Sequence, residues 1–186
     1  MPEKDLVTWL RAAALVAKKF PDARFVLVGE GRDSTTFGEL QTLVKTLGIV
    51  EEVIFLGYHR NLLPIYSAFD IFVLSSLREG LPNSILEAMA LGLPVVTTDV
   101  AGAKELVVNG ETGFVVPQKD SEGLARAIVT LLADHESRDR MGKAGRERIE
   151  TEFCFAKRLR RLEDLYDRVL KGYPSCTPSH NPAIAC

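Results

Sequence analysis

The sequence of 186 residues predicts an α/β fold, in which helices cover both faces of a mostly parallel, Rossmann-like sheet. Three observations carry this prediction. Segments with helical spacing of apolar residues alternate along the chain with short apolar runs. Most of those runs, such as residues 25–28, are apolar throughout, as is typical of strands that are buried on both faces. Polar residues and glycines gather after the runs, where the carboxyl ends of parallel strands form a ligand-binding crevice.

The first half of the chain alternates helices and strands. A helix is expected over residues 5–19, because apolar side chains recur at helical spacing until Pro21. The next helix stops at Gly48, and the first two strands stop at Gly29 and Gly57. In order, the expected elements are a helix over 5–19, a strand over 25–28, a helix over 36–47, a strand over 53–56, a short helix over 62–69 and a strand over 71–74.

The second half repeats the alternation and then becomes helical. A helix is expected over 83–91, followed by strands over 94–98 and 113–116. Two or three helices then fill residues 120–171. Residues 173–186 contain three prolines and no periodicity. We therefore expect one domain over residues 1–172 and an irregular tail over 173–186.

Composition narrows the class of protein. Hydrophobic residues make up 46% of the chain and charged residues 26%, as in soluble globular proteins. No apolar run is long enough to cross a membrane, and the first residues lack the apolar core of a secretion signal. The net charge of −2 argues against nucleic acid as a partner. Three widely spaced cysteines form no metal or disulfide pattern, which favours a reducing, cytoplasmic location.

The segment 75–94 follows a predicted strand and carries the candidate chemistry. Pro82 or Asn83 can begin a helix there, and Asn83 or Ser84 can cap it. The free backbone N–H groups and the positive dipole end of such a helix suit an anion, phosphate in particular. Gly80 lets a ligand approach the backbone closely.

Two carboxylates flank this helix start. Glu79 lies in the loop before the helix, and Glu87 lies about one turn inside it, so both are expected to face one cavity. We also expect Glu87 to be buried, because its neighbours are apolar. Carboxylates accept hydrogen bonds from vicinal diols. Diols at both ends of a diphosphate are the layout of a nucleotide sugar.

The sequence Glu-Gly-Leu-Pro-Asn-Ser-Ile-Leu-Glu-Ala-Met-Ala-Leu-Gly-Leu-Pro-Val-Val, which begins at Glu79, resembles the signature of group 1 (family 4) retaining glycosyltransferases. Residues 28–31, 55–58, 98–106 and 109–117 are similar to further motifs of that family, so the resemblance spans roughly residues 2–170. It implies a two-lobed GT-B fold of which this chain is the donor-binding, C-terminal lobe. The enzyme would transfer a sugar from a UDP- or GDP-sugar to an acceptor hydroxyl with retention, without cofactor or metal.

The resemblance also implies a role for individual residues. Glu79 would orient the donor sugar as the catalytic residue, and Glu87 would bind the ribose hydroxyls. Lys4 falls where the family has a phosphate-binding lysine, although Asp5 stands where the family has glycine. Gly80, Leu81, Pro82 and Asn83 would hold the sugar hydroxyls and the diphosphate; Gly29 and Gly31 would leave room for the nucleotide; Gly57, Tyr58, His59 and Arg60 would contact the base.

The order of the strands predicts an irregular sheet. In the doubly wound order the first strand is central. By the resemblance, the strand at 25–28 corresponds to the second strand of the family. If Met1 is the true start, the sheet is therefore expected to have a gap or to close differently, and the lobe to be unstable alone. If the chain is a fragment, residues ahead of Met1 would supply that strand, a phosphate-binding arginine and the N-terminal acceptor lobe.

Alternative interpretations remain for several features. The chain can be a nucleotide-binding module or an inactive fragment without turnover, and a phosphorylase-like relative is less favoured because no lysine is placed for a pyridoxal cofactor. His59 is a weak candidate for a base, and Lys104 for a phosphate ligand. The basic cluster 157–161 can make a peripheral membrane contact, but a solvated helix face is the preferred interpretation.

Overall fold

The computed structural model describes residues 2–29 and 34–172. The predicted tail over 173–186 and the candidate residue Gly31 lie outside the described residues. The chain divides into two compact units, of which the first ends at Ile149 and the second begins at Glu150. The elements are the 3₁₀ helix η1 (Pro2–Lys4), α1 (Leu6–Ala17), β1 (Phe25–Val28), α2 (Ser34–Leu47), β2 (Val53–Gly57), α3 (Leu63–Tyr66), β3 (Phe72–Leu74), α4 (Asn83–Ala90), β4 (Val95–Thr98), α5 (Ala103–Leu106), β5 (Gly113–Val116), α6 (Ser121–Ala133), α7 (His135–Glu152) and α8 (Phe155–Gly172).

The α/β class predicted from the sequence is confirmed. Each predicted strand is present, and three helices, α6 to α8, follow β5. The sequence analysis missed the short helices η1 and α5, which are too brief for a periodic pattern. The predicted helix at 62–69 is only the four-residue α3, which begins with a proline in its first turn.

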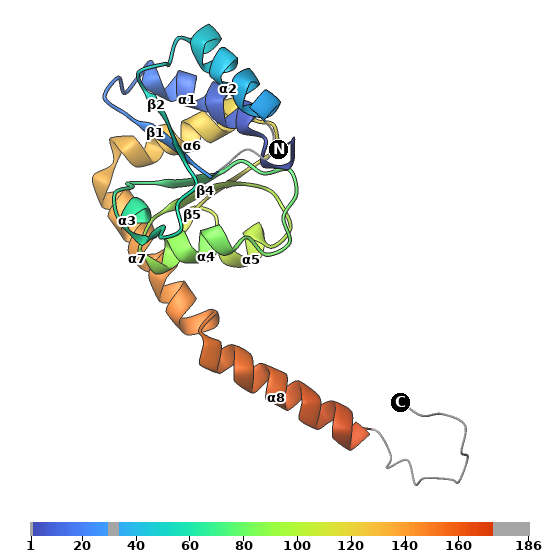
Figure 1. Cartoon of the computed structure of the whole chain (residues 1–186). Coiled ribbons are helices and arrows are strands. Elements are labelled where there is room, and N and C mark those ends of the chain that lie inside the picture. Colours follow the sequence, from blue (N-terminus) through green and yellow to red (C-terminus); the bar gives the residue numbers. More distant parts are fainter. Residues whose placement is uncertain (1, 30–33, 173–186) are drawn as a thin grey trace, which may run out of the picture. The chain divides into compact units, whose positions relative to one another are not determined.

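The strands form two parallel sheets. Strand β1 pairs with β2, and β4 lies between β3 and β5. Helices α1, α2 and α6 gather on one side of the strands, and α4 and α5 lie on the other (Figure 1). Among the described residues β1 and β3 do not pair, so the expected interruption of the sheet falls between these two strands.

The core of the first unit lies where α1 and α6 pack together over the strands. Leu10 and Val16 of α1 meet Leu124 and Leu131 of α6, and all four side chains are fully buried. All four residues of β4 are buried, since strands flank it on both edges. This core holds β4 rigidly beside the loop that follows β3.

Helix α7 fixes the turn that follows α4. The helix passes so close to this turn that a Cβ on Gly142 would collide with the carbonyl oxygen of Gly92. One turn further on, a Cβ on Gly145 would meet the Met89 side chain at an ordinary 3.5 Å. The two glycines therefore differ in the space around them, although both lie in the same helix.

We expect Gly142→Ala to lower the free energy of unfolding by about 1–2 kcal/mol, because a clash of about 1–3 kcal/mol exceeds the gain in helix propensity of about 1 kcal/mol. Gly145→Ala, its matched control, gains the propensity without the clash and should be neutral or more stable. Urea unfolding of both variants measures the difference. Equal stability of the two would mean that α7 is not fixed against the turn.

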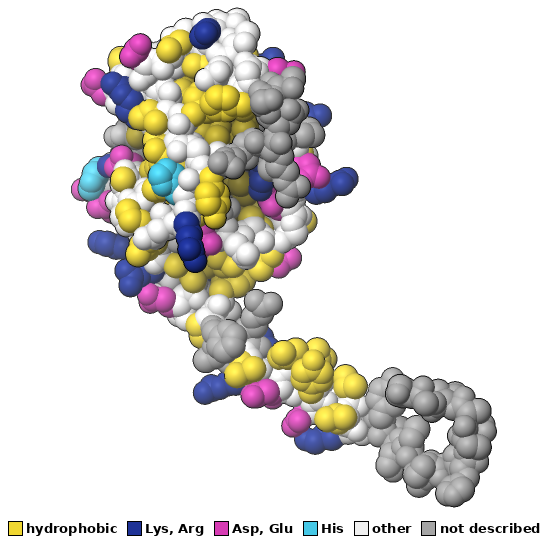
Figure 2. All heavy atoms as spheres, in the orientation of Figure 1, with side chains coloured by type: hydrophobic (Ala, Val, Ile, Leu, Met, Phe, Trp, Pro, Cys, Tyr) yellow, Lys and Arg dark blue, Asp and Glu magenta, His cyan; other side chains and the backbone are white. Residues whose placement is uncertain are grey.

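The second unit contains helix α8, whose side chains are strongly segregated. Leu159, Leu162, Leu165 and Val169 form an apolar stripe with about half of each side chain exposed, and Figure 2 shows hydrophobic and charged side chains along this helix. Lys157 and Arg161 pair with Glu152 at 3.4 and 3.5 Å. Within the described ranges, no helix is both long and apolar enough to span a bilayer.

Candidate functional site

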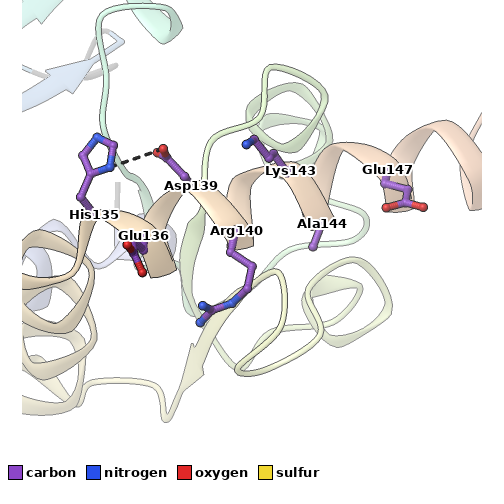
Figure 3. Close-up of a pocket in the computed structure, with 7 residues that line it drawn as sticks. All are labelled: His135, Glu136, Asp139, Arg140, Lys143, Ala144 and Glu147. Carbon is purple, nitrogen blue, oxygen red and sulfur yellow. Dashed lines mark ion pairs between the residues drawn. The ribbon is translucent and has the colours of Figure 1, made fainter.

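Two hollows in the described part of the chain differ in how they are built. One, of about 550 Å³, runs along α7 and is lined by His135, Glu136, Asp139, Arg140, Lys143, Ala144 and Glu147 (Figure 3). His135 and Asp139 pair at 3.4 Å, and every lining residue belongs to this single helix. A site needs convergent groups from several elements. We therefore assign no function to this hollow.

The larger cavity, of about 780 Å³, lies between β1 and β3 and reaches their carboxyl ends. Of the predicted site residues, Lys4, Gly29 and Tyr58 line it, together with His59. The lining does not include the other candidates, which are Gly57, Arg60, Glu79, Gly80, Leu81, Pro82, Asn83 and Glu87. Ser84 in the first turn of α4 connects that second group to the cavity.

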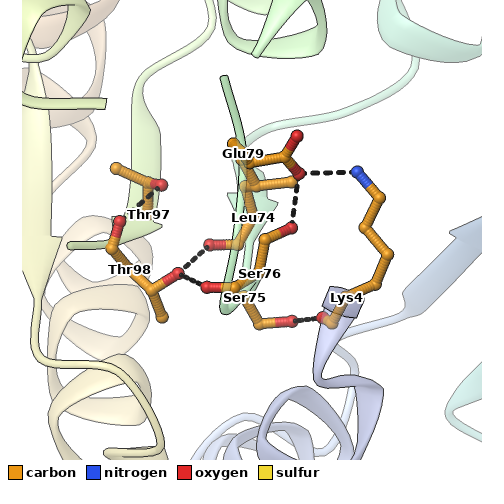
Figure 4. Close-up of polar contacts among 7 residues, drawn as sticks. All are labelled: Lys4, Leu74, Ser75, Ser76, Glu79, Thr97 and Thr98. Carbon is orange, nitrogen blue, oxygen red and sulfur yellow. Dashed lines mark hydrogen bonds and ion pairs between the residues drawn. The ribbon is translucent and has the colours of Figure 1, made fainter. Parts of the chain in front are cut away.

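The loop after β3 is held from two sides (Figure 4). On one side, the buried Thr98 hydroxyl of β4 donates to the Ser76 carbonyl oxygen at 2.6 Å. On the other, the Ser75 hydroxyl donates to the Lys4 carbonyl oxygen at 2.9 Å, and the Leu77 amide donates to the Glu3 carbonyl oxygen at 2.7 Å. The loop that carries Glu79 is thus held in place before any ligand arrives.

Glu79 is held by two donors. The Lys4 ammonium group and the Ser76 hydroxyl both lie 2.6 Å from its Oε1. The Glu79 side chain is only 15% exposed, which strengthens these charged contacts, whereas the Lys4 side chain is 44% exposed. Both contacts within the described residues use Oε1, so the second oxygen of the carboxylate can accept from a ligand. Lys4 and Glu79, 75 positions apart, are therefore brought together.

The start of α4 differs from the predicted cap. Pro82 occupies the cap position and makes no side-chain cap, so the prediction that Asn83 or Ser84 caps this helix is wrong. The proline side chain has no polar atom that could cap the helix, and its fixed φ suits a helix start. The first backbone N–H groups of α4 have no capping side chain and suit an anion. Gly80 has no atom within 4 Å of an ideal Cβ position, so the backbone there is approachable.

Gly102 brings a second loop against this helix start. Its φ of +75° is left-handed, and a Cβ there would collide with the Gly80 carbonyl oxygen and approach the Leu81 Cα to 3.1 Å. Only glycine satisfies both conditions without strain. The sequence analysis placed residue 102 in a motif but gave it no role.

We expect Gly102→Ala to weaken ligand binding at the α4 start about fivefold to tenfold, because the loop of Gly80 and Leu81 must shift. The strain of a non-glycine residue at this φ costs on the order of 1 kcal/mol in addition. Isothermal titration with UDP checks the affinity. Gly110→Ala has a comparable φ of +83° and open space, so it separates backbone strain from the clash. Equal affinities of the two variants would contradict this assignment.

Glu87 is exposed, so the expectation of a buried carboxylate is wrong. Helix α4 buries Ile85, Ala88 and Met89 on its other faces. The buried Tyr66 of α3 donates from its hydroxyl to Glu87 Oε2 at 3.0 Å. Burial, together with this carboxylate, raises the pKa of Tyr66 well above its ordinary value. Tyr66 therefore remains a donor at every physiological pH and fixes the direction of Glu87.

The ends of β1 and β2 form the remaining part of the site. Gly29 has a φ of +121°, which favours glycine, and its amide donates to the Gly57 carbonyl oxygen at 2.8 Å. Space beside Gly29 is open. Tyr58 is 67% exposed, Arg60 is exposed, and a His59 ring nitrogen lies 3.2 Å from the Leu56 carbonyl oxygen.

Three residues that sequence reasoning missed support this site. Ser76 and Tyr66 orient the two carboxylates, and Gly102 positions the α4 start. Ser76 lies in the segment 75–94 that the sequence analysis selected, whereas nothing in the sequence marks Tyr66, in the predicted short helix, as a partner of Glu87. Lys104, a weak candidate for a phosphate ligand, instead pairs with Asp99 at 2.6 Å. No group of three metal-ligating side chains occurs in the ranges that the structure describes.

The sequence of the chain is similar to a known family and to several curated proteins. The model of the family described as glycosyl transferases group 1 matches residues 1–148. N-acetyl-alpha-D-glucosaminyl L-malate synthase of Bacillus anthracis is 35% identical over 150 residues, 81% of this chain and 39% of that protein. The chain spans about two fifths of the length of the curated relatives it matches.

Solved structures with the same fold include members of the same family. Anabaena HepE, crystallised with UDP and glucose, superimposes with a TM-score of 0.83 at 25% identity over 90% of this chain and 46% of that one. The C-terminal domain of a group 1 family protein (LpcC) from Francisella tularensis gives a TM-score of 0.76 at 30% identity, covering 83% of this chain and 82% of that one. Two parallel sheets flanked by helices thus match the Rossmann-like architecture of these proteins.

Proposed function

Because the chain belongs to the group 1 glycosyl transferases, we propose that it is the donor-binding, C-terminal lobe of a retaining, family 4 enzyme of the GT-B fold. The lobe, residues 1–172, binds a UDP- or GDP-sugar. Together with an acceptor-binding lobe, it transfers the sugar to an acceptor hydroxyl. The likeness to an isolated C-terminal domain and to a protein crystallised with UDP and glucose supports this proposal.

The observation that carries the proposal is the arrangement around Glu79. A carboxylate fixed by Lys4 and Ser76 stands directly before the uncapped start of α4. A diphosphate at that helix start would lie beside Lys4, the cation that already reaches this loop. Glu79 would then accept from the hydroxyls of the sugar.

The main cost of sugar transfer is the negative charge that develops on the leaving diphosphate. As the bond from the anomeric carbon to the phosphate oxygen breaks, its electron pair and negative charge pass to the diphosphate. The α4 N–H groups and Lys4 stabilise that charge in place, without reorganisation. Glu79 orients the sugar so that the acceptor oxygen attaches to the same face, and the proton of the acceptor hydroxyl passes to the leaving diphosphate oxygen. Gly29, together with Gly31, leaves room for the nucleotide, Tyr58 and Arg60 contact the base, and Glu87 binds the ribose.

Titration of the chain with UDP, GDP and their glucose derivatives tests the proposal. We expect saturable binding of UDP or of GDP. Binding of neither nucleotide, or binding that survives both Glu79→Ala and Glu87→Ala, would overturn the assignment. Binding with no transfer even when an acceptor-binding lobe is supplied would support the second candidate, a nucleotide-binding module without turnover.

The cellular location is part of the same proposal. Sparse cysteines favour the reducing cytoplasm, where Cys154 would remain a free thiol. The exposed apolar stripe of α8, on the helix that carries the basic cluster 157–161, would suit a peripheral membrane contact.

A further inference from the structure

Gln118 joins two loops of the candidate site. It lies just beyond the end of β5, and its side-chain amide nitrogen donates to the Leu77 carbonyl oxygen at 3.2 Å and to the Asp99 carbonyl oxygen at 2.9 Å. Leu77 belongs to the loop after β3, and Asp99 to the loop after β4. A primary amide carries two N–H groups on one nitrogen, so each of them serves one carbonyl. One exposed side chain therefore ties both loops to the end of β5.

The backbone that carries Gln118 is itself held in place. Ahead of it, the Val116 carbonyl oxygen accepts from the Asp99 amide at 2.8 Å. Behind it, the Asp120 side chain caps α6 by accepting from an amide of the first turn at 2.7 Å. Between them, Lys119 has a φ of +60°, which is uncommon for a residue other than glycine and persists only where the surroundings fix it. The Gln118 amide therefore reaches the two loops from a fixed base.

The two loops are joined at two places, and Glu79 lies between them. The first junction is the Gln118 amide at Leu77, and the second is the close contact of Gly102 with Gly80. A carboxylate between two anchored backbone positions can change direction only a little, as a preorganised site requires. Without the first junction the segment that leads to Glu79 gains freedom, whereas the second junction still holds the start of α4.

The stability of the fold does not account for this contact. Gln118 is exposed, so its hydrogen bonds replace bonds to water and add little to the free energy of unfolding, while fixing a long side chain costs entropy. The loop already has an interior restraint, since the buried Thr98 hydroxyl donates to the Ser76 carbonyl oxygen at 2.6 Å. Gln118 adds a restraint one residue closer to Glu79. That position points to a role in the site.

We propose that Gln118 is a positioning residue for the donor sugar: by tying Leu77 to Asp99, it holds Glu79 in the direction in which the carboxylate meets the sugar hydroxyls. The inference rests on the proposed function, in which Glu79 contacts the sugar and the start of α4 contacts the diphosphate. It places control over the sugar at the end of β5, outside the segment 75–94. Loss of the amide should therefore weaken recognition of the sugar and leave recognition of the nucleotide unchanged.

Two substitutions of Gln118 test the proposal. Gln118→Met removes both donors and keeps the length of the side chain, and Gln118→Glu keeps its shape but repels both carbonyl oxygens. Gln41→Met makes the same change at an exposed position of α2 and is the matched control. Exchange of the Leu77 amide, which donates to the Glu3 carbonyl oxygen, reports on the loop without a ligand. Titrations with UDP, GDP and their glucose derivatives report on the site, and the melting temperature reports on the fold.

We expect both Gln118 variants to speed exchange of the Leu77 amide about threefold to tenfold. The advantage of the glucose derivative over the nucleotide should fall about threefold or more, with nucleotide affinity within about twofold and the melting temperature within about 3 °C of the native values. Gln41→Met should change none of these. Native exchange at Leu77, or faster exchange with an unchanged advantage of the glucose derivative, would overturn this inference alone. A native chain that binds no nucleotide would overturn the proposed function and this inference with it.

Discussion

Replacing Glu87 with alanine should weaken UDP binding about tenfold to hundredfold. The expected loss is that of charged hydrogen bonds to the ribose, about 1.5–3 kcal/mol. The exposed position of Glu87 on α4 means that the fold itself should tolerate the change, because the helix is anchored by Ile85, Ala88 and Met89. Isothermal titration of the purified variant measures the affinity, and its melting temperature verifies the fold.

A deoxynucleotide locates the lost contact. The native chain should prefer UDP to 2′-deoxy-UDP, and Glu87→Ala should bind the two almost equally. Glu51→Ala removes the same charge from an exposed turn and serves as the matched control for long-range electrostatics. If Glu87→Ala keeps the native preference for the ribose hydroxyl, then Glu87 does not bind the ribose.

In the same titrations, a Tyr66 variant separates the effect of the orientation of the Glu87 carboxylate from the effect of its charge. Tyr66→Phe leaves the carboxylate charged but removes the donor that directs it, 3.0 Å from Oε2. The variant should therefore lose several-fold in affinity, less than Glu87→Ala, while keeping part of the preference for UDP. Since the raised pKa keeps Tyr66 protonated, this contribution should not change between pH 6 and about 9.

Local patterns were sufficient to predict the fold. Most strands are continuous apolar runs such as Phe25–Val28, and such a signal depends only on neighbouring residues. The gap beside β3 could also be anticipated, because strand order follows from the resemblance to a family. Short helices such as η1 and α5 depend instead on tertiary hydrogen bonds, among them the bond from Leu77 to Glu3, which leave no periodic trace.

The charged residues of the candidate site could be predicted from the sequence, but the residues that hydrogen-bond to them and hold them in position could not. Glu79 and Glu87 were recognised from their spacing, and Lys4 from the resemblance alone. Ser76 and Tyr66 act through hydrogen bonds to those carboxylates, at 2.6 and 3.0 Å, and such bonds are decided by how elements pack in space. The exposure of Glu87 was misjudged for the same reason, since apolar neighbours along a helix point to other faces.

Glu79→Gln should have the largest effect on the reaction and a small one on nucleotide binding. In a two-lobed protein that contains this chain, we expect the rate of sugar transfer to fall about hundredfold or more, the scale of losing one preorganised polar group at the reacting centre. Affinity for UDP should stay within a few-fold, because the carboxylate contacts the sugar and not the nucleotide. Stopped assays of transfer, with titrations of UDP and UDP-glucose on the chain, measure both quantities.

A Lys4 variant decides between two explanations for the effect of Glu79→Gln. If Glu79 serves only to hold the Lys4 ammonium group, Glu79→Gln and Lys4→Met should each weaken UDP binding, and the double variant should be no weaker than either single one. If Glu79 binds the sugar, Glu79→Gln alone should remove the extra affinity for UDP-glucose over UDP, and Lys4→Met should lower both affinities in parallel. Because the two contacts at Oε1 leave the second oxygen to a ligand, we expect the second pattern. The first pattern would reduce Glu79 to a support for the phosphate-binding lysine.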